Sequence, residues 1–238
     1  AIAIGLSTAA TALVARRVGE GNGPEAGRAV GQVLLVSLSA ALLLGIPGAI
    51  FAPNVLRIMG ADDALIAHGS GFTRMIFASA PAIVGLHTLS GCLRGAGRAS
   101  EAMRSLWLAN GINIVLCPIF IFGWGPVPAL GVLGSAVATT TGRSVGVLYQ
   151  LYALAGGRQA VVRLTRAALR PDATLIGQLL KLAAGGTGQF LVGSASWVFL
   201  TRLIATFGPS VVAGYTIAVR ILIFTILPSW GLANAAAT

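Results

Sequence analysis

The sequence predicts an all-α integral membrane protein, and its composition is the first observation that leads to this class. Of the 238 residues, 56% are hydrophobic and only 9% are charged, and the mean hydropathy is +0.88. A soluble domain carries about 25% charged residues, so this chain has too few charges for a water-exposed surface. In lipid the backbone must satisfy its own polar groups, and the alternation typical of membrane strands is absent. The spanning elements are therefore expected to be helices.

A repeated sequence segment is the second observation. The segment Gly5–Gly23 begins GLSTAAT, and the segment Gly231–Thr238 reads GLANAAAT, 226 residues further on. Self-similarity at a fixed offset indicates an internal duplication. Because the chain is barely longer than one repeat, we expect it to be a piece of a duplicated protein, truncated at both ends.

Apolar runs with few or no charges predict seven helices. One run, 105–142, spans 38 residues, which exceeds the roughly 20 residues of a single span. A Gly- and Pro-rich stretch at 123–128 divides it. We expect helices at 1–15, 29–51, 64–93, about 102–122, about 131–156, about 173–206 and about 210 to the end.

Basic residues gather in alternate connections between these helices. Segments 16–28, 94–104 and 157–181 carry eleven cations together, and the positive-inside rule places them on the cytoplasmic side of a bacterial inner membrane. The first and seventh helices then run in the same direction, so the repeats contain six helices each and are parallel, as in secondary transporters. The expected organisation is most of a first lobe (1–156, five helices), a cytoplasmic inter-lobe loop (157–172) and the start of a second lobe (173–238, two helices).

No arrangement of residues typical of an enzyme is present. The sequence lacks a GxxxxGK[ST] phosphate loop, and its six acidic residues lie in or beside predicted loops rather than paired in a protected site. Cys92 and Cys117 have no metal-ligand spacing. The net charge is +10, but the basic residues do not form a patch interleaved with aromatic residues. This argues against a nucleic-acid partner. We therefore expect no enzymatic activity, no metal, no cofactor and no nucleic-acid partner.

Polar and aromatic residues within the predicted spans are the functional candidates. Asn110 and Asn113 lie three residues apart, near one face of a helix, and could bind a cation or hydrogen-bond to a neighbouring helix. His87 could relay protons or be a structural histidine. Aromatic residues on the last two helices could line a cavity for a flat cation or lie at the membrane interface. The substrate-cavity candidates are Phe190, Trp197 and Tyr215.

A resemblance rests on six stretches taken in order, namely 5–23, 57–62, 93–98, 113–123, 131–139 and 207–221. Together they resemble the multidrug and toxic compound extrusion (MATE) transporters over the whole chain. The resemblance implies a twelve-helix antiporter with two lobes and V-shaped alternating access, which exports small amphipathic cations in exchange for protons or sodium. We expect the full-length protein to be a monomer whose partners are membrane lipid and these substrates.

The resemblance also implies a cation site. Asn113 falls on the family's cation-site asparagine and Thr139 near a threonine of the same site, with Asn110 as a further candidate. One helical turn on, where many members have Asp or Asn, this chain has Cys117, a poor ligand for sodium. Gly193 stands where some members carry a glutamate, and the family's first-helix aspartate lies outside the chain.

Two alternatives stay open. A flippase of the same superfamily would move a lipid-linked precursor, and it would be favoured if Arg143 and Arg220 faced the central cavity. A non-transporting membrane module, such as an assembly subunit, would be favoured by a gene that ends at Thr238.

Overall fold

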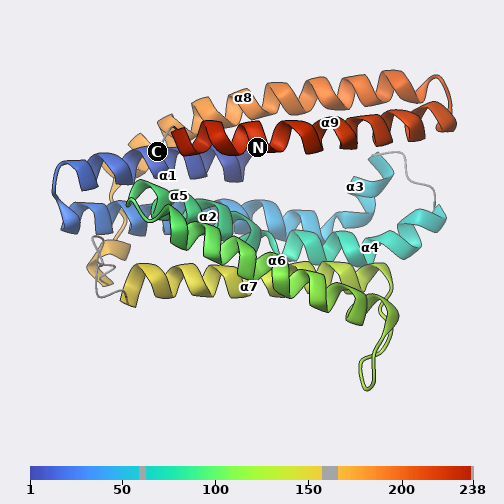
Figure 1. Cartoon of the computed structure of the whole chain (residues 1–238), viewed down its shortest axis with the longest axis horizontal. Coiled ribbons are helices and arrows are strands. Elements are labelled where there is room, and N and C mark those ends of the chain that lie inside the picture. The colour runs from blue at the N-terminus through green and yellow to red at the C-terminus, as the bar shows by residue number, and fades with distance from the viewer. Residues whose placement is uncertain (59–62, 157–165, 237–238) are drawn as a thin grey trace.

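A computed structural model describes residues 1–58, 63–156 and 166–236 as helices joined by short turns (Figure 1). The long helices lie side by side. In Figure 1, α8 and α9 form one edge of the bundle and α7 the opposite edge. The elements are α1 (Ile2–Gly19), α2 (Gly23–Ile50), α3 (Ala52–Ile58), α4 (Asp63–Ala78), α5 (Ala80–Gly95), α6 (Ala99–Phe122), α7 (Val132–Gly156), the 3-10 helix η1 (Arg166–Leu169), α8 (Ala173–Ala205) and α9 (Pro209–Ala236).

Several of the described helices have the length and composition of membrane spans. The helices α1, α2 and α6 are each long and apolar enough to cross a membrane. The segments Ile66–Ala78 and Ala80–Gly95 pass the same test together, as one span bent by 41°. The helical membrane class predicted from the sequence is therefore confirmed.

The prediction of one continuous helix at 64–93 is wrong, because the chain bends at Ser79 between α4 and α5. Pro81 lies in the first turn of α5. Its ring and its missing N–H prevent an unbroken helix through this point. Composition shows where apolar segments lie, but it does not register the effect of a proline inside such a segment.

A second difference is α3, a seven-residue helix that was not predicted. Pro53 lies in the first turn of α3, where proline is tolerated. The predicted inter-lobe loop falls largely on 157–165, which lies outside the described residues; its last part forms η1. The repeat at Gly231–Thr238 reaches the end of α9, and its final two residues also lie outside the described part.

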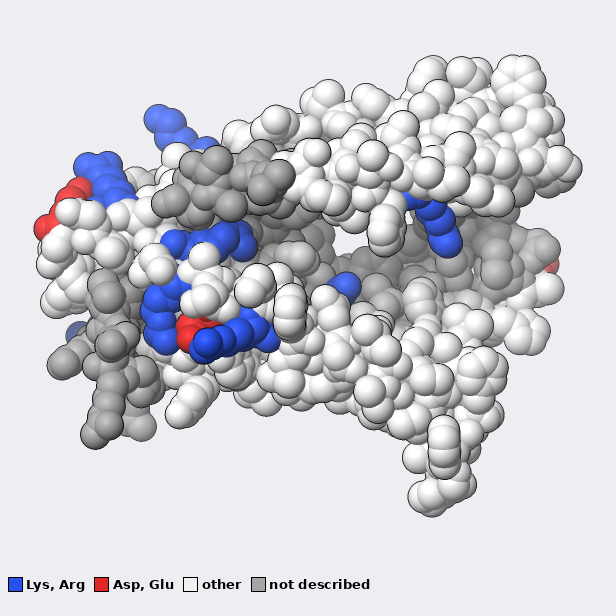
Figure 2. Space-filling model, viewed as in Figure 1, with Lys and Arg blue, Asp and Glu red and all other residues white. Residues whose placement is uncertain are grey.

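The connections grouped above by charge lie at one end of the bundle. The α1–α2 turn, the α5–α6 turn and η1 are at the left of Figure 1, and Figure 2 shows Lys and Arg side chains gathered there. Hydrogen bonds from Arg16 and Arg17, both at 3.0 Å, hold the pKa of Glu20 below its usual range. This end is the predicted cytoplasmic side.

Glycines let α1 approach its neighbours at backbone distance. On α5, a Cβ at Gly91 would collide with the carbonyl oxygen of Ser7. On the side of α8, a Cβ at Gly5 would collide with Thr187. Small residues have this role in membranes, where close dispersion contacts rather than burial from water hold helices together. The helix α1 is thereby held between α5 and α8.

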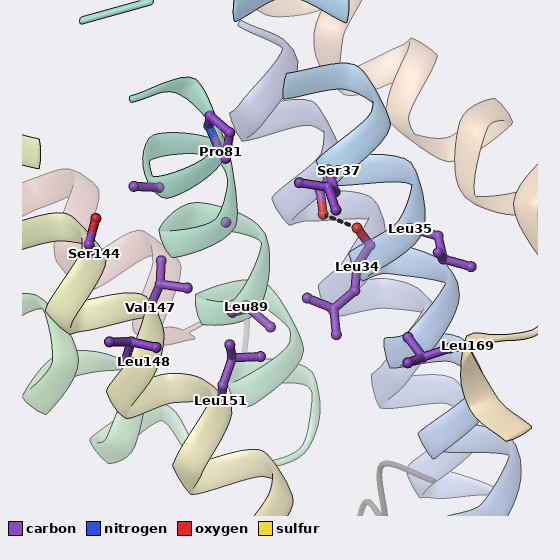
Figure 3. Close-up of a pocket in the computed structure, with 13 residues that line it drawn as sticks. Leu34, Leu35, Ser37, Pro81, Leu89, Ser144, Val147, Leu148, Leu151 and Leu169 are labelled. Atoms are coloured by element: carbon purple, nitrogen blue, oxygen red, sulfur yellow. Dashed lines mark hydrogen bonds between the residues drawn. The ribbon is translucent and has the colours of Figure 1, made fainter. Parts of the chain in front are cut away.

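The helices α2, α5 and α7 leave a groove of about 630 Å³ between them (Figure 3). Its wall is aliphatic apart from two serines, and Leu169 of η1 lies at one end. The lining residues are Leu34, Leu35, Ser37, Leu38, Pro81, Ala82, Gly85, Leu89, Ser144, Val147, Leu148, Leu151 and Leu169.

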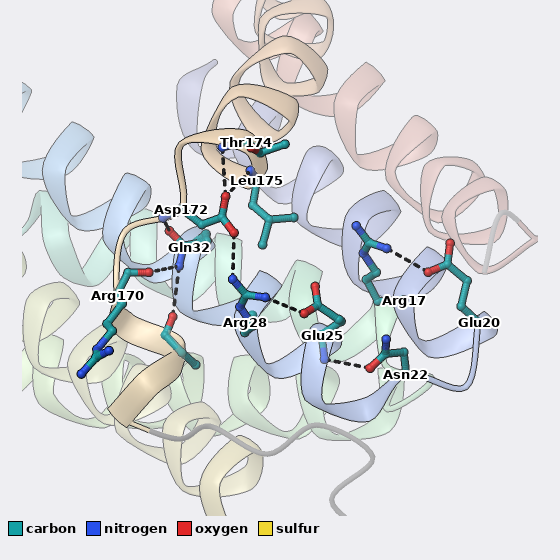
Figure 4. A network of polar contacts seen from close by, with 11 residues as sticks. Arg17, Glu20, Asn22, Glu25, Arg28, Gln32, Arg170, Asp172, Thr174 and Leu175 are labelled. Atoms are coloured by element: carbon teal, nitrogen blue, oxygen red, sulfur yellow. Dashed lines mark hydrogen bonds and ion pairs between the residues drawn. The ribbon is translucent and has the colours of Figure 1, made fainter.

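A buried glutamine fastens the end of the inter-lobe loop to α2 (Figure 4). The side chain of Gln32 donates to the carbonyl oxygens of Ala168 (3.1 Å) and Arg170 (2.8 Å), and its oxygen accepts from the N–H of Asp172 (3.0 Å). Gly31 permits this contact, because a Cβ there would collide with the carbonyl oxygen of Ala168.

Asp172 extends the attachment to α8. One carboxylate oxygen accepts from the N–H groups of Thr174 and Leu175 and so caps the helix. The other accepts from Arg28 on α2 at 2.9 Å. The first turn of α8 is therefore tied to the first lobe by Gln32 and by this ion pair.

The α1–α5 contact predicts that Gly91→Ala destabilises the protein, because the new methyl group would force the two backbones apart. Overpacking of this kind costs about 1–3 kcal/mol. The measurement is the thermal unfolding midpoint of the full-length protein in detergent. Gly111→Ala on α6 is the matched control, because its Cβ would meet nothing within 4 Å. Equal midpoints for the two variants would contradict the packing argument.

The attachment at Gln32 predicts that Gln32→Leu loosens the linker. Leucine would leave two carbonyl oxygens and one N–H without partners, at about 1–3 kcal/mol for each buried group left unsatisfied. Trypsin should then cleave after Arg166 in η1 faster than in the wild type, and the unfolding midpoint should fall. The control is Gln189→Leu on the exposed surface of α8. If Gln32→Leu left the cleavage rate unchanged, the linker would not depend on this side chain.

Candidate functional site

The structure brings two of the three predicted cation-site residues together. The side-chain N–H of Asn113 on α6 donates to the hydroxyl of Thr139 on α7 at 3.0 Å, and this hydroxyl donates to the carbonyl oxygen of Ser135 at 2.8 Å. The orientation of the amide follows, because a hydroxyl that donates to a carbonyl must accept from the asparagine nitrogen. The side-chain oxygen of Asn113 has no hydrogen bond among the described residues and is available to a cation.

Close packing of α6 on α7 positions this pair. A Cβ at Gly142, one turn beyond Thr139, would collide with the carbonyl oxygen of Ala109. The backbones can therefore approach closely enough for the short Asn and Thr side chains to meet. The contact is also the interhelical hydrogen bond that was the alternative interpretation of Asn113, and cation binding stays a prediction.

Asn110 lies away from the pair. Its side chain is exposed and makes no hydrogen bond within the part of the chain that the structure describes. Three residues along an α-helix correspond to about 300° of rotation, and the offset of about 60° is enough to turn Asn110 away from α7. Cys117, one turn beyond Asn113, is half-buried.

His87 on α5 is exposed, and its ring makes no hydrogen bond in the described ranges. The positive charges of Arg143 on α7 and Arg94 on α5 are near enough to act on it. Arg94 does not extend into the basic turn, as its sequence position suggested, but donates to the hydroxyl of Ser7 on α1 at 3.0 Å. The described residues give the structural interpretation of His87 no hydrogen bond as support, and both interpretations stay predictions.

The aromatic candidates lie on α8 and α9. Ala183 and Thr187 face Gly5 of α1. Phe190 and Trp197 follow Ala183 by seven and fourteen residues, so they continue the same face of α8. Trp197 is 49% exposed, and Figure 2 shows a hollow between the α8–α9 pair and the rest of the molecule. Tyr215 on α9 is half-buried. Their role in substrate binding stays a prediction.

A buried polar cluster was missed by the sequence analysis. Gln150 on α7 is fully buried and donates to the hydroxyls of Ser90 on α5 (2.7 Å) and Ser105 on α6 (2.6 Å). It joins three helices, as a polar side chain inside a membrane bundle commonly does. A glutamine within a predicted membrane span was the available signal.

The chain is similar to transporters described in bacteria. The MatE family model matches residues 1–119. A probable multidrug resistance protein, YoeA of Bacillus subtilis, is 24% identical over 98% of this chain and 50% of its own length. The multidrug export protein MepA of Staphylococcus aureus is 25% identical over 76% of this chain and 39% of its own. A FAD transporter of Shewanella oneidensis is 30% identical over 58% of this chain and 30% of its own. The chain thus spans half the length of YoeA and less of the others.

Solved structures of transporters share the fold. An inward-facing multidrug resistance MATE family transporter of the MOP superfamily matches with a TM-score of 0.84 at 30% identity, over 95% of this chain and 51% of that one. A MOP superfamily transporter from Pyrococcus furiosus, described as having a binding pocket of reverse polarity, matches at 0.87 and 31% identity over 98% of this chain and 51% of that one. These likenesses confirm the resemblance on which the two-lobe helical fold was predicted, and the chain belongs to the MatE family.

Proposed function

We propose that the full-length protein is a secondary antiporter that exports small amphipathic organic cations across the bacterial inner membrane, in exchange for protons or sodium. Relatives described as multidrug resistance and multidrug export proteins support drug export. The basic end of the bundle supports a cytoplasmic placement for the α1–α2 turn, the α5–α6 turn and the inter-lobe loop.

The observation that carries this proposal is the aromatic character of one face of α8. Its first half packs against α1 as far as Thr187, and beyond this point the same face presents Phe190 and Trp197. Aromatic faces attract cations and also contact flat apolar rings. An aromatic face of this kind suits a molecule that is both cationic and apolar.

The contacts suggest how the coupling ion and the drug act on the lobes. The coupling ion and the drug must each bind one arrangement of the lobes better than the other. The side-chain oxygen of Asn113 would bind the ion, while Thr139 fixes the orientation of the amide. The first turn of α8 is tied to α2 through Asp172, so the second lobe would move beyond that turn.

A second candidate is the transport of an anionic amphipathic compound, such as a lipid-linked precursor. Arg143 is half-buried within the bundle and near His87, and an arginine at this depth could pair with an anionic group. The relative described as a FAD transporter also favours transport of an anionic compound. Arg220 is exposed on α9 and adds no support.

Export is tested by expressing the intact gene in a bacterium that lacks its main efflux pumps. The cells should accumulate less of a fluorescent cationic dye, and either an uncoupler or removal of sodium should restore accumulation. An unchanged dye level under every gradient would refute cation export. The second candidate would be favoured if the cells accumulated less of a fluorescent anionic lipid and if the variant Arg143→Gln no longer lowered this accumulation.

The cation site predicts that Thr139→Val weakens ion coupling, because valine keeps the shape but removes the oxygen that orients Asn113. Loss of an interaction worth about 1.4 kcal/mol raises the half-maximal ion concentration about tenfold. Dye efflux from proteoliposomes at varied sodium and pH is the measurement. Thr139→Ser should restore coupling, and Asn110→Ala is the control. Wild-type ion dependence in both Thr139→Val and Asn113→Ala would exclude this site.

A further inference from the structure

We propose that the groove between α2, α5 and α7 binds one acyl chain of an anionic phospholipid from the leaflet at the basic end of the bundle. No step of this inference depends on which compound the protein exports. The groove lies outside the α6–α7 pair at Asn113, and on α5 it occupies a different face from the α1 contact, because Gly85 and Leu89 line it while Gly91 faces α1.

The position of the groove matches one leaflet. Along α5 it extends from Pro81, just past the mid-span bend, to Leu89, which is about 12 Å at 1.5 Å per residue. Leu169 of η1 lies at its other limit, at the basic end. Half of a bilayer's hydrocarbon core is about 15 Å thick. The groove therefore covers the depth of an acyl chain in the leaflet on the basic side.

The size of the groove suits a single acyl chain. Its volume is about 630 Å³. A single flexible hydrocarbon chain is thin enough to fit. The wall offers a partner helix few polar groups: the hydroxyl of Ser37 already donates to the carbonyl oxygen of Val33 on its own helix, and Ser144 supplies the other hydroxyl among the lining residues.

A cation at the end of the groove favours an anionic headgroup. Arg170 follows Leu169 directly, is exposed, and makes no side-chain hydrogen bond or ion pair among the described residues. Figure 4 shows its guanidinium directed away from Asp172 and Gln32. Gln32 bonds only backbone groups of this segment, and the Asp172 carboxylate pairs with Arg28. A free guanidinium one residue beyond the apolar wall is placed for a phosphate at the membrane surface.

The test uses the full-length protein in nanodiscs that contain phosphatidylcholine and a phosphatidylglycerol with a photoreactive group on its acyl chain. After irradiation, peptides that contain 81–89 and 144–151 should carry most of the label. Unlabelled phosphatidylglycerol should compete better than phosphatidylcholine in the wild-type protein. Label spread evenly over exposed apolar surfaces, equal competition by the two lipids, or crosslinks between two copies at the groove would each overturn the proposal.

Two variants separate the chain contact from the headgroup contact. Ala82→Phe fills the groove and should abolish the preferential labelling, whereas Leu43→Phe, at a 74% exposed position of α2, should leave it unchanged. Arg170→Gln should reduce the preference for phosphatidylglycerol about fivefold, as expected for one basic residue at an anionic surface. Wild-type labelling in Ala82→Phe, or an unchanged lipid preference in Arg170→Gln, would refute the corresponding contact. Dye efflux is not a readout, so failure here leaves the antiport proposal to its own test.

Discussion

Backbone-close contact along α1 is the interaction on which the rest of the structure depends. Gly91 brings α5 against one side of this helix, and Gly5 brings α8 against another. In lipid, apolar side chains gain little by leaving one apolar environment for another, so attraction comes from many short dispersion contacts. These contacts fall off steeply with distance, and only small residues allow them along a whole interface. Close backbone contact at Gly142 likewise brings α6 and α7 together and allows Asn113 to reach Thr139.

The attachment of the linker adds a polar constraint to this packing. Gln32 and the Arg28–Asp172 pair act at the same place but contribute unequally. The ion pair is partly exposed, with 49% and 25% of its side chains accessible, and pairs of this kind contribute at most about 1 kcal/mol. Gln32 satisfies three backbone groups in a buried position, where each unsatisfied group is costly. As a result, the first turn of α8 is fixed to the first lobe although sequence order assigns it to the second.

Sequence patterns predicted the elements better than their breaks and contacts. The predicted ranges of α7 and α8 agree with the structure within a residue or two, because charged residues and Gly- and Pro-rich segments mark their ends. The run at 64–93 was predicted as one helix, because hydropathy does not register the effect of Pro81. At the candidate site, the spacing of Asn110 and Asn113 suggested a shared face. Only Asn113 contacts α7, since the direction of a side chain depends on how the neighbouring helix is rotated.

The sequence by itself determined that the chain is a helical membrane protein, that its basic connections share one end, and that it carries a repeat. Each of these properties is local or periodic and follows from composition, charge and spacing. The tertiary structure decided which helices touch, that Gln32 holds the linker, that Gln150 joins three helices, and that a groove remains between α2, α5 and α7. These features depend on contacts between residues far apart in the chain. In lipid such contacts are selected by shape at close range, and hydropathy along the sequence carries almost no record of that shape.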